Sequence, residues 1–133
     1  IDVPFHSRQL LPGVSAFRSL LEPRFSYASI RRYKERLIGQ YIPNVYAKPF
    51  SIDRLYIEKV AEVTGSANLY RLLETFETVD DTQKTRTLLI ELLAHQFAMP
   101  VQWIDTQDYI FSRRSQRIME MGPSPTLVGM AKK

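Results

Sequence analysis

Residues 87–97, TLLIELLAHQF, carry the clearest structural signal in the sequence and decide how its centre folds. Their apolar side chains recur at the spacing of one helical face: Leu88, Leu89, Leu92, Leu93 and Phe97. Pro100 follows closely, and a proline ends a helix because it has no backbone N–H and clashes with the preceding turn. The pattern therefore predicts a core helix that ends before Pro100.

Weaker helical patterns lie on both sides of this segment. Residues 11–21 hold apolar side chains at helical spacing, with Pro12 suited to a first turn and Pro23 beyond the end. Residues 29–37 indicate a basic helix that ends near Gly39. Further helices are expected at residues 51–64, 66–76, 101–111 and 126–133.

Three segments are predicted to be strands. Residues 1–5 alternate as a strand does and begin with Ile rather than Met, so we expect the chain to be part of a longer one. Residues 41–50, YIPNVYAKPF, are rich in β-branched and aromatic side chains, and residues 117–121 precede a Gly-Pro turn. Strands separated by helices indicate an α/β fold.

The composition excludes several classes of protein. A chain of 133 residues with 44% hydrophobic and 24% charged residues is globular and no larger than one domain. It has no Cys and only two His, so we expect no disulfide and no metal site. No apolar run approaches the roughly 18 residues of a membrane span, so we expect a cytoplasmic protein with no membrane contact.

The net charge of +4 comes mainly from basic residues at 31–36, at 113–117 and at the C-terminus. Solvated helix faces explain such clusters, which lack the motifs of nucleic-acid binders. We therefore expect no nucleic-acid partner, and an anionic small molecule or an acidic protein is the remaining alternative. The sequence also has no Gly-rich phosphate loop of the GxGxxG or Walker type.

His6 has more catalytic potential than the other residues. It lies in VPFHS, at the end of an expected strand and before a helix, where layered α/β proteins hold catalytic groups. From the residues alone, a hydrogen-bonded structural histidine is the more frequent outcome, and His95 is interpreted as structural. Asn44, in YIPNV, is either a pocket residue or a residue that stabilises a turn.

Four segments together resemble a known family. They are IDVPFHSRQLLPGVSAFRSLL at residues 1–21, IGQYIPNVYAKPF at 38–50, LLIELLAHQFAMPVQWIDTQD at 88–108 and MEMGPSPTLVGMAKK at 119–133. In this order they resemble the C-terminal part of the malonyl/palmitoyl transferase domain of fungal and actinobacterial type I fatty acid synthases. The resemblance implies that residues 1–133 are an incomplete α/β hydrolase-like acyltransferase core.

The same resemblance implies a junction near residues 74–86, where two-subunit synthases divide the domain between their chains. Residues 77–85, ETVDDTQKT, include one aliphatic side chain in nine, which makes this stretch the best candidate for a linker. This chain is continuous across that point, so it resembles either a fused single-chain synthase or an engineered join of the two parts.

The function implied by the resemblance is acyl transfer in fatty acid biosynthesis. His6 falls on the histidine that activates a serine, and Asn44 is the candidate for substrate binding. The serine's GHSxG motif is absent from this sequence, so the serine would lie outside this chain. The substrates would be malonyl-CoA, palmitoyl-CoA and the phosphopantetheine arm of the acyl carrier domain, with no bound cofactor.

The partners implied are the remainder of the transferase domain and of the fatty acid synthase. The alternative is a non-catalytic segment that completes a domain within a multienzyme assembly.

The spacing of Gln96 and Pro100 leaves one backbone carbonyl without its helical partner. In a helix, the Gln96 oxygen would accept a hydrogen bond from the N–H of residue 100, which proline lacks. An unpaired buried carbonyl costs free energy, so another donor is expected. The resemblance implies that this donor is the Nδ1–H of His6, which makes His6 and Gln96 the expected catalytic pair.

Overall fold

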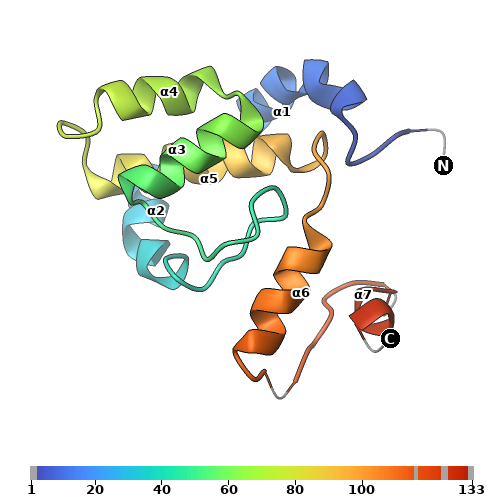
Figure 1. Ribbon diagram of the computed structural model, residues 1–133. Coiled ribbons are helices and arrows are strands. Elements are labelled where there is room, and N and C mark those ends of the chain that lie inside the picture. The colour runs from blue at the N-terminus through green and yellow to red at the C-terminus, as the bar shows by residue number, and fades with distance from the viewer. Residues whose placement is uncertain (1–2, 116, 124–125, 132–133) are drawn as a thin grey trace.

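Helix α5, Asp81–Gln96, lies at the centre of a bundle of helices (Figure 1). The computed structural model describes residues 3–115, 117–123 and 126–131. Four helices pack against α5: α1 (Val14–Leu21), α2 (Tyr27–Tyr33), α3 (Arg54–Thr64) and α4 (Ala67–Glu74). Helices α6 (Trp103–Ser112) and α7 (Thr126–Ala131) follow and lie to one side of this bundle (Figure 1). Short 3₁₀ turns at Arg8–Gly13, Glu22–Arg24 and Lys34–Arg36 complete the helical elements described.

The predicted core helix is confirmed, and it begins earlier than the apolar pattern does. Asp80 caps it, because its carboxylate accepts a hydrogen bond from the N–H of Gln83 at 2.8 Å. Leu88 and Leu92 are fully buried in the main apolar cluster, together with Phe50, Ile57, Val60 and Leu69. Helix α5 therefore organises the core, as its sequence predicts.

The turn between α3 and α4 shows how neighbouring residues end one helix and start the next. Gly65 adopts φ 67°, the left-handed conformation that follows a helix end and that glycine adopts without a steric penalty. The Ser66 hydroxyl accepts a hydrogen bond from the N–H of Leu69 and so caps α4. The boundary expected between the helices at residues 51–64 and 66–76 is therefore confirmed.

The expected α/β hydrolase-like core is wrong for this chain, because the part that the structure describes contains helices and no strand. Residues 41–50 form an irregular loop instead. Pro43, Val45 and Ala47 alternate into the core, so the strand-like pattern reflects burial against helices. Two backbone hydrogen bonds close the loop, from the Phe50 N–H to the Tyr41 carbonyl at 2.7 Å and from the Gly39 N–H to the Phe50 carbonyl at 2.8 Å.

The other two predicted strands also fail. Ile1 and Asp2 lie outside the described residues, and the chain then turns, since the Phe5 N–H donates to the Val3 carbonyl at 2.8 Å. Residues 117–121 form neither a helix nor a strand, and Met121 is 95% exposed. A strand needs a neighbour to supply its hydrogen bonds, and the described residues offer none to either segment.

The linker expected within residues 74–86 is shorter than its composition indicates. Helix α4 ends at Glu74 and α5 begins at Asp81, so the second half of the polar stretch is the first turn of a helix. Polar residues at 77–85 thus serve partly as helix start signals. The subunit junction near this point stays a prediction.

We expect Gly65→Ala to destabilise the folded chain by about 1 kcal/mol, because a side chain disfavours the left-handed conformation. No atom lies within 4 Å of an added Cβ at Gly65, so backbone strain is the sole cost. Gly122→Ala is the matched control, since Gly122 has the same open surroundings without a positive φ. Urea unfolding measures both, and equal stability of the two variants would contradict this explanation.

Candidate active site

The turn that carries His6 is held against the C-terminal end of α5. The His6 backbone N–H donates to the Phe97 carbonyl at 2.7 Å. His6 has φ 59°, a left-handed conformation that is uncommon outside glycine and is found at functional sites when surrounding contacts enforce it. The hydrogen bond to the Phe97 carbonyl holds His6 in this conformation.

The side chain of His6 makes a second contact with the same helix end. Its Nδ1 lies 2.9 Å from the backbone oxygen of Gln96. A carbonyl only accepts, so Nδ1 carries the proton, and in the neutral ring Nε2 becomes the acceptor. The structure thus brings His6 and Gln96 together through the backbone carbonyl that the sequence analysis left unpaired, and the catalytic role of the pair stays a prediction.

An apolar pocket of about 300 Å³ opens beside the imidazole. Its lining residues are Phe5, His6, Phe17, Leu21, Leu93, Gln96 and Phe97. Phe17 meets Phe97 edge to face, with ring centroids 5.4 Å apart. The imidazole of His6 is therefore the ionisable group of this pocket, which otherwise offers contact to apolar groups.

Asn44 does not lie with these residues. Its backbone carbonyl accepts a hydrogen bond from the Gln102 N–H at 2.8 Å, next to the start of α6, and it is absent from the lining of the His6 pocket. This contact is made by the Asn44 backbone, so it does not distinguish between the two roles expected of the side chain. A substrate-binding role for Asn44 has no support from its position.

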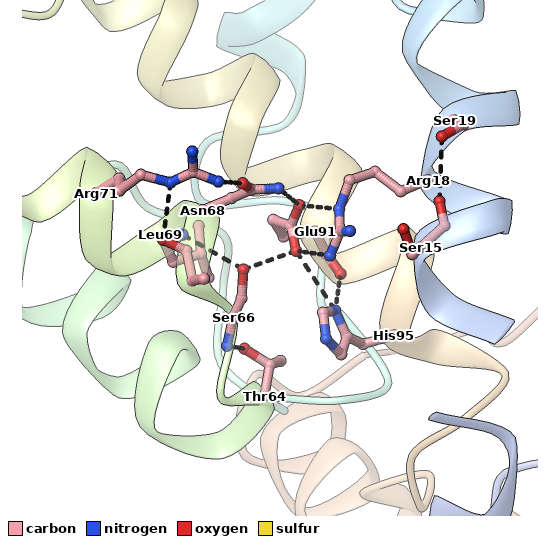
Figure 2. A network of polar contacts seen from close by, with 11 residues as sticks. Ser15, Arg18, Ser19, Thr64, Ser66, Asn68, Leu69, Arg71, Glu91 and His95 are labelled. Carbon is pink, nitrogen blue, oxygen red and sulfur yellow. Dashed lines mark hydrogen bonds and ion pairs between the residues drawn. The ribbon is translucent and has the colours of Figure 1, made fainter. Parts of the chain in front are cut away.

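A buried carboxylate lies near the site and was not predicted from the sequence. Glu91, on α5, has a side chain only 2% exposed and forms a two-point ion pair with Arg18 of α1, with distances of 2.5 and 2.9 Å (Figure 2). The Ser66 hydroxyl and the Asn68 amide at the start of α4 each donate to Glu91 at 2.7 Å. The available signal was a lone glutamate within LLIELL, which indicates a paired charge inside the core.

These donors control the ionisation of Glu91. Burial alone raises the pKa of a carboxyl, but the hydrogen bonds from Arg18, Asn68 and Ser66 outweigh it and hold the pKa of Glu91 below its usual value. The bond to Glu91 in turn raises the pKa of Arg18. The pair is therefore charged at neutral pH.

His95 has a structural position, as its sequence context predicts. It is buried, and its Nδ1 lies 2.8 Å from the Glu91 carbonyl one turn earlier. Within the described part of the chain, no group of three or more His, Asp or Glu side chains is arranged to hold a metal ion. Nor does any described helix have the length and apolar character needed to cross a bilayer.

The fold and site define a helical segment that presents one fixed histidine beside an apolar pocket, and no family model matches it. The comparison with curated proteins is specific. The chain is 48% identical over its full length to Fatty acid synthase 2 of Mycosarcoma maydis. Two relatives match parts of it: Fatty acid synthase subunit beta of Aspergillus oryzae, 51% identical over 72 residues, and Fatty acid synthase subunit alpha of Schizosaccharomyces pombe, 58% identical over 55 residues.

The chain is thus homologous to a segment of fungal fatty acid synthases. It spans 4% of the length of the first two relatives and 3% of the third, whereas those relatives cover 100%, 54% and 40% of this chain.

We expect Glu91→Gln to lower the stability of the folded chain at neutral pH by about 3 kcal/mol, because it leaves the Arg18 guanidinium without its counter-charge. The pKa of Glu91 is lower in the folded than in the unfolded chain, so its contribution is present above about pH 4.5 and is lost as the pH falls through the folded value. Urea unfolding from about pH 3 to 7 should therefore show a shallower acid decline for the variant.

The control for this experiment is Glu77→Gln, which changes an exposed carboxylate in the turn before α5. It should follow the wild-type pH profile. An unchanged profile for Glu91→Gln as well would contradict the assignment of the acid sensitivity to Glu91.

Proposed function

We propose that this chain supplies the histidine side of an acyltransferase site in a fatty acid synthase. The observation that carries the proposal is the fixed imidazole: the Nδ1–H of His6 is held by the Gln96 carbonyl at 2.9 Å, which leaves Nε2 as the basic nitrogen. Homology to fungal fatty acid synthases supports the placement of this chain within such an enzyme. The family resemblance of the PFHS segment supports the catalytic role of the histidine.

The reaction we propose is transfer of malonyl and palmitoyl groups between coenzyme A and an acyl carrier domain. A serine of the longer protein attacks the thioester carbonyl carbon, and its proton passes to Nε2 of His6. The imidazolium returns that proton to the leaving coenzyme A sulfur, and an acyl-serine ester remains. The carrier thiol then gives its proton to Nε2 and attacks the ester, and the serine oxygen recovers the proton.

This chain contributes two things to that reaction. It holds the ring of His6 in the tautomer that can accept a proton, because the Gln96 carbonyl can only accept from Nδ1–H. It also places the apolar side chains of Phe17, Leu21 and Leu93 beside the ring, and the ring itself is exposed. The chain has no GxSxG sequence, so the nucleophile would belong to another part of the synthase. The family resemblance implies the same for the group that binds the malonyl carboxylate.

A second candidate function is a non-catalytic role in which the chain completes a larger domain. Large apolar side chains of α6 and the segment after it are exposed: Ile104 at 73%, Met119 at 70% and Met121 at 95%. In addition, the indole Nε1 of Trp103 is buried without a hydrogen-bond partner among the described residues. Both features fit a segment that packs against further protein, and they are compatible with the catalytic proposal.

We expect His6→Ala in the complete synthase to lower malonyl and palmitoyl transfer together by at least about 10², because both half-reactions would use the same base. Initial rates with radiolabelled malonyl-CoA and palmitoyl-CoA measure the two activities. Arg31→Gln serves as the control, since Arg31 lies on α2 and outside the His6 pocket. Full activity of His6→Ala would leave the structural role as the function of this chain.

We expect Gln96→Ala to retain most of the activity, because alanine keeps the carbonyl that accepts from His6. Pro100→Ala should be more damaging, since an N–H at position 100 lets α5 continue and compete for that oxygen. The comparison uses the same transfer assay in the complete synthase. If Gln96→Ala is as inactive as His6→Ala, the side chain is the catalytic group and the backbone argument is wrong.

A further inference from the structure

Helices α1 and α5 carry the two halves of the His6 site. The His6 turn leads directly into the 3₁₀ turn Arg8–Gly13 and then into α1, while the carbonyls of Gln96 and Phe97 stand at the end of α5. Any shift of α1 along or around α5 therefore moves the imidazole relative to the oxygen that fixes it. The alignment of these two helices sets the geometry of the site.

Apolar packing accounts for part of this alignment and includes the edge-to-face pair of Phe17 and Phe97. The fully buried members of the contact are Val14, Ala94 and Ala98, which are small. These small side chains bury little apolar area, and apolar contacts have no preferred direction. Phe97 and Leu21 add partly buried contacts at the edge.

The ion pair of Arg18 and Glu91 adds a directional contact to this packing. Arg18 lies on α1 twelve residues after His6, and Glu91 lies on α5 five residues before Gln96, which is about 7.5 Å along the helix axis. The guanidinium meets both carboxylate oxygens, and this two-point geometry fixes direction as well as distance. The Ser66 and Asn68 donors hold the carboxylate itself in place (Figure 2).

We propose that Arg18 and Glu91 are a positioning pair for the general base, an inference that rests on the proposed function. The pair touches neither substrate nor His6, and it acts by holding α1 in register with the end of α5. A displaced general base stabilises the transition state less, but it leaves substrate binding almost unchanged. Loss of the pair should therefore lower kcat and leave KM unaltered.

The test is steady-state malonyl transfer by the complete synthase carrying Arg18→Lys or Arg18→Gln. Lysine keeps a positive charge beside Glu91 but cannot reproduce the two-point contact. This variant therefore distinguishes the effect of losing the two-point geometry from the effect of leaving the Glu91 charge unpaired. We expect kcat to fall by about tenfold or more in Arg18→Gln, with a smaller fall in Arg18→Lys, while KM for malonyl-CoA stays within about twofold. The graded response in kcat at constant KM is the signature of positioning.

Val60→Ala is the control for simple loss of stability. Val60 is fully buried in α3, in the main cluster and away from α1, so its truncation weakens the bundle without changing the alignment of α1 and α5. We expect its kcat to stay at the wild-type value at a temperature where all variants are folded. Equal falls in kcat for Val60→Ala and Arg18→Gln would overturn the positioning role.

His6→Ala, measured in parallel, separates this inference from the proposed function. If His6→Ala abolishes transfer and Arg18→Gln leaves kcat unchanged, the histidine is the base and the positioning pair is wrong. If His6→Ala keeps transfer, the proposed function fails, and the positioning role fails with it.

Discussion

The buried carboxylate of Glu91 is the constraint on which the rest of the bundle depends. Removing an ionised carboxylate from water costs several kcal/mol unless charged and polar partners replace the water. Three side chains from two other helical regions meet this need, namely Arg18 of α1 together with Ser66 and Asn68 at the start of α4. A single charge on α5 therefore dictates where α1 and α4 can lie, which non-directional apolar packing does not do.

Helix α5 thus has three different tasks along its length. One face, with Leu88 and Leu92, anchors the main core, and Glu91 fixes the helices on either side. Its C-terminal carbonyls, which have no partner within the helix, receive the two donors of His6. The chemistry assigned to this chain therefore depends on an unsatisfied helix end, and Pro100 ensures that the end stays unsatisfied by the chain that follows.

The sequence predicted the helices well, because helical periodicity and caps are local properties. The pattern of residues 87–97, the Gly65–Ser66 boundary and the free Gln96 carbonyl could each be derived from a few neighbouring residues. The strands at residues 41–50 and 117–121 were wrong, since a strand depends on a distant partner and alternation alone also arises in a loop packed on helices. The Arg18–Glu91 contact spans 73 positions, and no local pattern could reveal it.

The His6 pocket and the exposed side chains beyond α5 point to the same conclusion about how the site is divided. A general base needs a nucleophile within hydrogen-bond reach, and the pocket beside His6 is lined by apolar groups and the Gln96 segment. In the proposed function the chain therefore supplies orientation and proton transfer, while the bond-forming oxygen comes from another segment of the synthase. Such a division makes rigidity the property that this segment must contribute, because an imidazole that is misplaced by about 1 Å loses much of its effect on a serine held by another segment.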